Sequence, residues 1–494
     1  MAFRRAQIGR RFEDARQPGR LPGAVRVDSS DLSSAPRGAP VTFDFEGRTL
    51  RAFDGQPVAV ALHAAGVKVL GRSSKYHRPR GFFCLDGHCA SCYLRIDGRP
   101  NRRACMTPVR EGLRCERQNA FPSADVDLLR AADWLFPEGM DHHTLMTETR
   151  VGNALFLKLV RQMGGSGMLP DAPAAALDSG RAIEHVDLCI VGGGPAGLAA
   201  ARACAEAAPR AHVVLFDEQA AFGGSLLAAP GGGAHGAEMA AAAQRAGARL
   251  ESDATAIAFF PEDGETTSDG GDTRNTTGLL AVVTPAGLRR VVARRYLYAT
   301  GAYDQNLPFA DNDRPGIVSA RACGRLAFHH GVRPVPPGKR VLVLAASEAT
   351  GPAAMVDALA AAGIDAELVT ISASGNGAAQ PRVVGVRGAQ SVRAVEIESA
   401  AGAGKTRVVS ADLVAVAALP APASELARQH GAEVAFDPAR GGFAVVVDGS
   451  FRTRTREVFA CGDVTGFAGA DAAAQAGEAA GHAIAADLGT GAAP

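Results

Sequence analysis

The sequence predicts an α/β protein that begins with a smaller α+β domain and continues as a two-dinucleotide-binding-domain fold. Three observations predict it. The length of 494 residues exceeds the usual size of one domain. From Val186 to about residue 485, short apolar segments alternate with Ala-rich helical segments, which is typical of a doubly wound parallel sheet. Upstream, four of the nine cysteines lie between positions 84 and 105, among segments that read as hairpins.

Apolar alternation and turn residues define the small domain. Val41, Phe43 and Phe45 alternate with polar residues before a turn at 46–48, so we expect a hairpin and then a helix at 57–65. A second hairpin is expected after the cysteines. We divide the chain into a basic arm (1–40), this domain (41–120), a connector (121–184), the first part of a dinucleotide-binding domain (185–338), a degenerate second one (339–440) and the return of the first (441–494).

Charge is unevenly distributed along the chain. The formal net charge is +1, but residues 1–40 carry eight Arg against four acidic residues, and residues 41–120 carry fourteen Lys and Arg against seven acidic residues. Such a block binds nucleic acid, faces an acidic partner or offsets a buried anionic centre. We favour the last role and expect no nucleic-acid partner, because no aromatic platform accompanies the charge. A merely solvated charged face is the alternative.

The sequence gives no sign of a membrane span or an export signal. No stretch of about 18 apolar residues is present. Arg10 and Arg11 are followed by Glu13 and Asp14 rather than by the apolar run that an export signal requires. We therefore expect a cytoplasmic protein.

Four cysteines form a C-x4-C-x2-C-x12-C pattern: Cys84, Cys89, Cys92 and Cys105. Thiolates at this spacing suit a [2Fe–2S] cluster, in which a tight loop supplies three ligands and a returning strand the fourth. Such a loop needs a positive φ, and Gly87 inside the first interval adopts one without strain. A zinc site, which normally shows two C-x2-C knuckles, and cysteines without a ligand are the alternatives.

The segment around these cysteines also carries a resemblance. Residues 71–109, GRSSKYHRPRGFFCLDGHCASCYLRIDGRPNRRACMTPV, resemble the ferredoxin-like module of hydrogen cyanide synthase and of related amino-acid dehydrogenases. The opening GRSSKYHRPRG is similar to the N-terminal region of the sarcosine oxidase α subunit. The resemblance implies a β-grasp fold with all four cysteines as cluster ligands.

A glycine fingerprint opens the large domain. The segment VDLCIVGGGPAGLAAARACAEAA places G-x-G-x-x-G on Gly192, Gly194 and Gly197, between a buried strand and a helix that begins with Pro195 and Ala196. The first glycine permits the turn, the second lets the backbone approach a pyrophosphate, and the third lets helix and strand pack closely. The phosphates would face the N-terminus of the helix.

The next strand, HVVLFDE, ends in two acidic residues. Asp217 is placed to accept a hydrogen bond from a ribose hydroxyl, and Glu218 is the neighbouring candidate. On these features alone FAD, NAD and a structural turn without a cofactor all remain open.

Three further segments resemble the two-dinucleotide-domain flavoproteins, in particular the α subunits of hydrogen cyanide synthase and of heteromeric proline dehydrogenases. They are FDEQAAFGGSLL, LYATGAYDQNLPF and TREVFACGDVTGF. The resemblance implies FAD. It places Gly223 and Gly224 near the flavin, Thr300 and Gly301 at a domain crossing, and Gly462 and Asp463 at the ribityl chain, where a carboxylate accepts hydroxyl hydrogen bonds.

The second dinucleotide domain lacks its glycines. Residues 339–371 have the strand–helix–strand pattern, but Ala345, Ser347 and Thr350 stand where the fingerprint would be, and their β-carbons crowd a pyrophosphate. Gly351 is shifted relative to the motif. We expect no working NAD(P) site here, and a non-redox nucleotide is the alternative.

Taken together, these features predict an electron-transfer subunit, with FAD and a [2Fe–2S] cluster, of a heteromeric dehydrogenase or oxidase. The resemblance implies a separate flavin-bearing subunit that oxidises an amino acid, imino acid or secondary amine. A further flavin, FMN or FAD, in or at the interface with that subunit, and additional small subunits, belong to this expectation. No pattern in this chain indicates a general base or an amine site, so we assign no catalytic residue.

Two other functions compete with this prediction. One is a self-contained NAD(P)H-dependent reductase, like a ferredoxin reductase fused to its ferredoxin, that feeds an oxygenase or demethylase; it requires a working second nucleotide site. The other is a scaffold that stabilises a catalytic partner and keeps only vestigial cofactor sites.

Overall fold

A computed structural model describes residues 38–131 except Lys75, then 182–261, 278–347, 349, 351–372, 380–399 and 406–490, with isolated positions between 150 and 173. Nearly all of the predicted basic arm and most of the predicted connector lie outside these residues.

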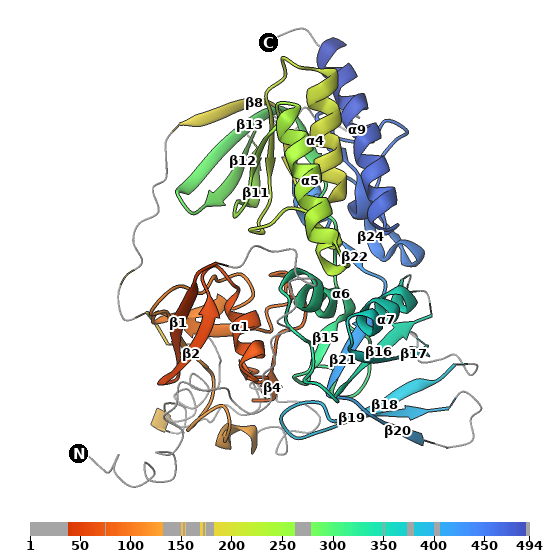
Figure 1. The fold of residues 1–494 in the computed structure, drawn as a ribbon. Coiled ribbons are helices and arrows are strands. Elements are labelled where there is room, and N and C mark those ends of the chain that lie inside the picture. Colours follow the sequence, from red (N-terminus) through yellow and green to blue (C-terminus); the bar gives the residue numbers. More distant parts are fainter. Residues whose placement is uncertain are drawn as a thin grey trace.

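The N-terminal domain is a five-stranded sheet with one helix, in a β-grasp arrangement (Figure 1). Both expected hairpins and the expected helix are present. The first strand also pairs in parallel with the last strand of the domain. In sheet order, the strands are β2 (Arg48–Phe53), β1 (Pro40–Phe45), β7 (Arg114–Glu116), β5 (Tyr93–Ile96) and β6 (Arg99–Arg103); the helix is α1 (Val58–Ala64), and a small ribbon consists of β3 (Gly71–Arg72) and β4 (Pro79–Arg80).

The first strand of the largest sheet, β8 (Ile183–Val191), ends directly before the glycine fingerprint. Strand β9 (Val213–Phe216) and the C-terminal half of β8 are buried, as in parallel sheets covered on both faces. In sheet order, all strands of this sheet are β10 (Arg249–Glu251), β9, β8, β13 (Gly287–Tyr298), β12 (Gly278–Thr284) and β11 (Thr255–Pro261), with β25 (Val458–Ala460) also paired to β13. Three helices lie together along one side of it: α4 (Pro195–Ala207), α5 (Gly232–Arg245) and α9 (Ala470–Thr490) (Figure 1).

This sheet is not parallel throughout, which corrects the expected alternation of strands and helices. The strands β11, β12 and β13 form an antiparallel meander. The reason is the connection after Thr284, because β13 already begins at Gly287 and so short a link can join only antiparallel strands.

A second, four-stranded parallel sheet follows. In sheet order, its strands are β15 (Ile317–Ser319), β21 (Leu413–Ala417), β16 (Arg340–Ala346) and β17 (Asp365–Ile371). Helix α6 (Ala320–Gly324) and a π-helical turn η5 (Arg325–His329) connect β15 to β16, and α7 (Pro352–Ala361) connects β16 to β17. Beside the four-stranded sheet lies an antiparallel sheet of β18 (Arg382–Arg387), β19 (Ala394–Glu398) and β20 (Thr406–Ser410).

Short elements join the two parallel sheets. Strand β14 (Ala302–Tyr303) leaves the first sheet and pairs with β22 (Ala421–Pro422), which leads back to it. The remaining elements are α8 (Glu425–Gln429), the hairpin β23 (Val434–Asp437) and β24 (Gly442–Val445), and the 3₁₀ turns η3 (Leu128–Arg130), η4 (Gly224–Ala228), η6 (Pro438–Arg440) and η7 (Gly462–Thr465).

The N-terminal domain packs directly on the second parallel sheet, and the two share one hydrophobic core. Phe43 and Leu62 of the N-terminal domain belong to the same cluster as Leu326 of η5 and Val341 of β16. Backbone contacts cross the boundary as well, since the amide of Ser319 donates to the carbonyl of Phe83 at 2.9 Å. The cysteine segment is therefore fixed relative to the dinucleotide-binding part.

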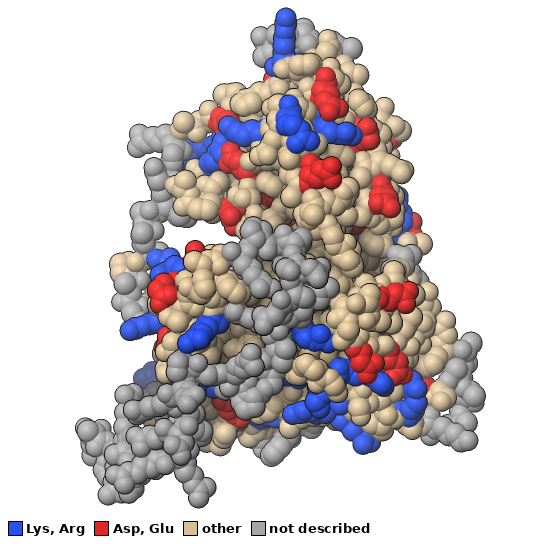
Figure 2. Space-filling model, viewed as in Figure 1, with Lys and Arg blue, Asp and Glu red and all other residues tan. Residues whose placement is uncertain are grey.

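Many arginines of the basic block are paired. Arg117, for example, reaches both Glu46 and Asp125, and Arg80 lies 2.5 Å from Asp313. Basic and acidic side chains are interspersed over much of the described surface in Figure 2. Among the described residues, none of the helices combines the length and the apolar character that a membrane span requires.

Candidate functional site

The four predicted ligand cysteines come together. Sγ of Cys92 and Sγ of Cys105 lie 3.5 Å apart, and the thiol of Cys84 is in hydrogen-bond contact with those of Cys89 and Cys105. Three of the four side chains are buried, and Cys89 is half-buried. In the described part of the chain no group of three or more His, Cys, Asp or Glu surrounds a single-ion position, whereas a [2Fe–2S] cluster spreads its four ligands around two irons. The donor set fits a [2Fe–2S] cluster.

The loop between the first two cysteines has the geometry that the sequence predicts. Gly87 has a φ of +84°, and its carbonyl accepts a hydrogen bond of 2.7 Å from Nη1 of Arg103. The backbone amide of Asp86 points at Sγ of Cys84, 3.4 Å away. Backbone amides aimed at the sulfurs are a known means of tuning such clusters.

Ten of the predicted FAD residues line one cavity of about 620 Å³. They are Gly192, Gly194, Pro195, Ala196, Asp217, Glu218, Gly224, Thr300, Gly301 and Asp463. The other three lie directly behind its wall. Gly197 packs on the carbonyl of Gly192, the amide of Gly223 donates to the carbonyl of Gly193, and Gly462 packs on Ala196.

The glycine turn leaves room for a phosphate. A Cβ at Gly192, where φ is +109°, would lie 2.2 Å from the carbonyl oxygen of Ala299, so only glycine fits. At Gly194 the nearest atom to such a Cβ is 3.9 Å away, which leaves the N-terminus of α4 open to the cavity. This is the cradle that a pyrophosphate occupies in dinucleotide-binding folds.

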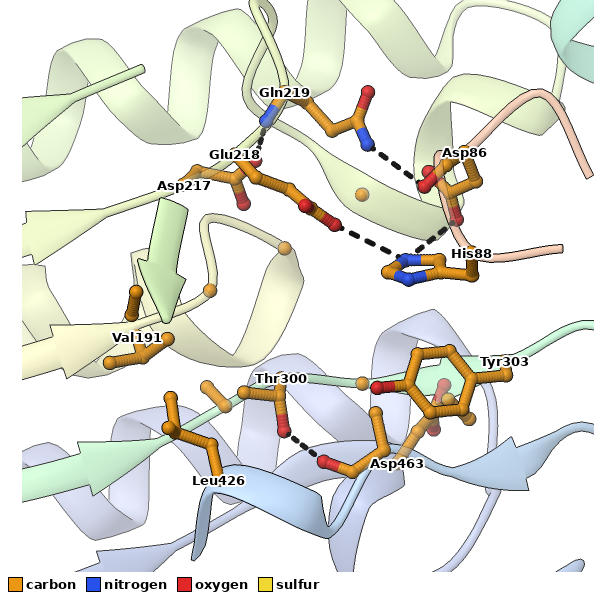
Figure 3. A pocket seen from close by; sticks show the side chains of 18 of the residues that line it. Asp86, His88, Val191, Asp217, Glu218, Gln219, Thr300, Tyr303, Leu426 and Asp463 are labelled. Carbon is orange, nitrogen blue, oxygen red and sulfur yellow. Dashed lines mark hydrogen bonds and ion pairs between the residues drawn. The ribbon is translucent and has the colours of Figure 1, made fainter. Parts of the chain in front are cut away.

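The two acidic residues after β9 have different surroundings. The Asp217 carboxylate accepts hydrogen bonds from the backbone amides of Gly193 and Gln219, so both of its oxygens hold the turn. Burial raises the pKa of Asp217 to about 6. The carboxylate of Glu218 instead faces the cavity (Figure 3). Both residues line the cavity, and both stay predicted ribose acceptors. We expect Glu218 to be the one that binds, because Asp217 already accepts two backbone hydrogen bonds.

The opposite wall carries Thr300 and Asp463 (Figure 3). Oγ1 of Thr300 donates to the carbonyl of Ala423 at 2.7 Å, which ties together the two chain crossings between the sheets. Asp463 is buried, and burial raises its pKa. Its carboxylate accepts a long bond of 3.3 Å from the amide of Ala468 and a further backbone bond from Gly469. Its remaining acceptor capacity fits the hydroxyls of a ribityl chain.

Residues that the sequence did not single out connect the cavity to the cysteines. Asp86 and His88, both inside the C-x4-C interval, line the cavity. Nε2 of His88 lies 3.3 Å from Oε1 of Glu218 (Figure 3). Arg325, buried at the start of η5, donates to Oδ2 of Asp86 at 2.8 Å and to the carbonyl of Cys84 at 3.2 Å.

The sequence could not have revealed these contacts. Asp86 and Glu218 are more than a hundred residues apart, and no motif includes Arg325. Burial raises the pKa of Asp86, while the guanidinium of Arg325 opposes this effect.

The second dinucleotide motif has the predicted position but not a glycine-rich turn. Strand β16 ends at Ala346, and α7 begins at Pro352 behind Gly351, whose φ is +85°. Ala345 stands where the first glycine of a fingerprint would be, and its β-carbon occupies space that a pyrophosphate needs. The absence of NAD(P) binding here stays a prediction.

Comparisons with known proteins match both parts of the site. Residues 38–120 match the family of the 2Fe-2S iron-sulfur cluster binding domain, and residues 190–229 match that of the NAD(P)-binding Rossmann-like domain.

Two groups of relatives are similar in sequence. The sarcosine oxidase subunit alpha of Rhizobium meliloti (strain 1021) is 30% identical over 439 residues, which are 82% of this chain and 42% of the relative. This chain thus spans less than half the length of that relative. The hydrogen cyanide synthase subunit HcnA of Pseudomonas aeruginosa is 40% identical over 81 residues, which are 16% of this chain and 77% of that subunit.

Among solved structures, the L-proline dehydrogenase from P. horikoshii has a similar fold. It aligns with a TM-score of 0.65 and 22% identity, over 94% of this chain and 76% of that one.

Proposed function

Because this chain belongs to the α-subunit-type flavoproteins with a fused [2Fe–2S] domain, with FAD and a [2Fe–2S] cluster as its cofactors, we propose that it is the electron-transfer subunit of a heteromeric dehydrogenase or oxidase. A partner subunit oxidises an amino acid, an imino acid or a secondary amine, and this chain transfers the electrons. The partner carries a flavin of its own, or shares one, FMN or FAD, at the interface.

One observation supports this proposal most directly: the cysteine loop and the glycine fingerprint line the same cavity. Asp86 and His88 stand between two cluster ligands, and both reach the space that Gly194 and Asp463 also border. A protein that only needed two independent cofactors would have no reason to bring these segments together.

The two cofactors supply complementary chemistry. FAD accepts one or two electrons, whereas a cluster held by four thiolates accepts one at a time. The chain's residues hold them close: Cys84, Cys89, Cys92 and Cys105 bind the cluster, and the turn at 192–197 with Glu218 and Asp463 binds FAD. We assign no residue of this chain to the oxidation of the amine.

Substrate class and partner follow from the relatives. One similar protein is a subunit of sarcosine oxidase, another is a subunit of hydrogen cyanide synthase, and the structural neighbour is named L-proline dehydrogenase. Sarcosine and L-proline are therefore the first substrates to test.

The test compares the chain alone with the complex that copurifies with it from its native host. Under anaerobic conditions, sarcosine, L-proline, NADH and NADPH should each leave the visible flavin band of the isolated chain unchanged. In the complex, an amine or amino acid should bleach the band. Rapid bleaching of the isolated chain by NADH or NADPH would instead identify a self-contained reductase.

A second comparison addresses the scaffold hypothesis. Cys89→Ser should leave the complex assembled but abolish electron transfer to the acceptor. Unchanged turnover would show that the cluster is vestigial.

A further inference from the structure

The wall of the FAD cavity comes from two domains. Besides the dinucleotide-binding segments, the cavity is lined by Asp86 and His88 of the ligand loop, residues 84–89 (Figure 3). We propose that this ligand loop is part of the FAD-binding site, so that cluster binding and FAD binding strengthen each other. The inference rests on the proposed function, because it requires both cofactors in one chain.

On the cavity side, the ligand loop touches the segment expected to hold the ribose. Nε2 of His88 lies 3.3 Å from Oε1 of Glu218, and Nε2 of Gln219 donates to the carbonyl of Asp86 at 3.3 Å. The His88 ring also packs on the ring of Tyr303 from the opposite wall, with 4.6 Å between centroids. One loop residue thus spans the cavity from wall to wall.

On the cluster side, the conformation of the ligand loop needs support. Leu85 has a φ of +50°, and Ala90, just beyond the loop, has a φ of +57°. Residues other than glycine keep such conformations only where their surroundings hold them. Bonds from Cys84 and Cys89 to a cluster would fix the loop at both ends. Without these bonds, the loop can relax, and the cavity wall then changes with it.

A competing anchor makes the proposal testable. Arg325 is buried and donates to the carbonyl of Cys84 and to the Asp86 carboxylate. If these bonds alone held the ligand loop, removing the cluster would leave the FAD site unchanged. If the cluster bonds also hold the ligand loop, removing the cluster weakens FAD binding.

The experiment measures the Kd for FAD of the full-length chain by anaerobic flavin fluorescence titration. Three forms are compared: the cluster-loaded chain, the same chain after removal of iron by a chelator, and Cys89→Ala. Coupling between two sites typically changes affinity by about 5- to 150-fold. We expect both cluster-free forms to bind FAD more weakly within this range.

The matched control is Cys115→Ala, which alters a buried cysteine of the same domain that lies outside the C-x4-C-x2-C-x12-C pattern. Cys115→Ala should keep the cluster and the Kd of the loaded chain. Because a cluster-free chain can also lose its fold, a second variant, His88→Gln, is measured with the cluster in place. It should weaken FAD binding severalfold while the electron paramagnetic resonance (EPR) spectrum of the reduced cluster is retained.

The outcomes separate this inference from the proposed function. If FAD binds with equal Kd with and without the cluster, and His88→Gln changes nothing, the coupling is refuted, but a chain with both cofactors remains. If no form of the chain binds FAD, the proposed function fails together with the inference.

Discussion

Nη2 of Arg325 lies 2.8 Å from Oδ2 of Asp86, and this buried ion pair joins the cysteine loop to the dinucleotide-binding part of the chain. The two residues are separated by 239 positions in sequence. The side chain of Arg325 is only 5% exposed, and that of Asp86 is 18% exposed. Within the described ranges, this pair is the shortest ion-pair contact of either side chain; Oδ2 of Asp304 lies 4.0 Å from Nη1 of Arg325, and Nε2 of His88 lies 4.0 Å from Oδ2 of Asp86.

The first prediction concerns this pair. Arg325→Gln leaves the Asp86 carboxylate without its cation, and breaking a buried pair in this way costs about 3–5 kcal/mol. We expect a clearly lower Tm and faster loss of the cluster to a chelator, followed by its visible absorbance. Arg382→Gln, which breaks the more exposed pair with Glu398, is the control and should change little, because solvent screens that pair. Equal Tm values for the two variants would contradict the role of Arg325.

The second prediction concerns the glycine turn. In Gly192→Ala the new Cβ would meet the carbonyl oxygen of Ala299 at 2.2 Å. Overpacking of this kind costs about 1–3 kcal/mol, so we expect FAD affinity to fall about tenfold or more in an equilibrium titration.

Gly247→Ala is a matched control for this substitution. Its φ of +107° is close to that of Gly192, at +109°, but no atom lies within 4 Å of the added Cβ. It introduces the same backbone strain without the clash. Gly247→Ala should lower stability slightly and leave the Kd for FAD unchanged, and a similar loss of FAD affinity in both variants would argue against the cradle.

The third prediction separates the two acidic residues after β9. Glu218→Gln should weaken FAD binding, because its carboxylate faces the cavity. Asp217→Asn should mainly lower the Tm, since the asparagine NH₂ group cannot accept the hydrogen bond that one of the two backbone amides donates. Calorimetric titration with FAD and thermal unfolding distinguish the two effects. The reverse pattern would assign ribose binding to Asp217.

The fourth prediction concerns pH. His430 is 1% exposed, its Nδ1 lies 2.8 Å from the hydroxyl of Tyr298, and burial lowers its pKa to about 3. The ordinary value is 6.5, so protons bind the unfolded state more readily. The stability that the folded chain gains from keeping His430 neutral is fully present above pH 6.5 and is lost as the pH falls toward 3.

The variant His430→Gln tests this contribution. A single histidine of this kind steepens the decrease in the free energy of unfolding with falling pH by at most about 1.4 kcal/mol per pH unit. Urea unfolding between pH 7 and pH 4 should therefore show a shallower loss of stability in His430→Gln than in the unchanged chain. Parallel curves would mean that His430 does not contribute to the acid sensitivity.

Local patterns in the sequence predicted much of the fold. The hairpin around Glu46 and Gly47, the strand that ends at Val191 and the helix that begins at Pro195 were all predicted, because each depends on neighbouring residues. The positive φ of Gly87 was predicted for the same reason. The antiparallel meander β11–β13 was missed, since a strand pattern does not record the direction of its partner.

Contacts between distant segments could not be predicted. Nothing near Asp86 or His88 indicates that Glu218 and Arg325 lie beside them, because these residues come from the N-terminal domain, the end of β9 and η5, which only the packing of the whole chain brings together. The sequence likewise proposed both Asp217 and Glu218 for the ribose. The amides of Gly193 and Gln219, which occupy the Asp217 carboxylate, distinguish the two only in three dimensions.

Freeze-quench EPR can follow the exchange of electrons between the cluster and the FAD of one chain. The FAD of the anaerobic, cluster-loaded chain is reduced by a light pulse with EDTA as the electron donor, and samples are frozen at increasing times. Electron exchange predicts that the EPR signal of the reduced cluster appears as the reduced flavin gives up one electron, and that Cys89→Ser shows no such signal. A flavin that stays reduced beside an oxidised cluster at all times would contradict it.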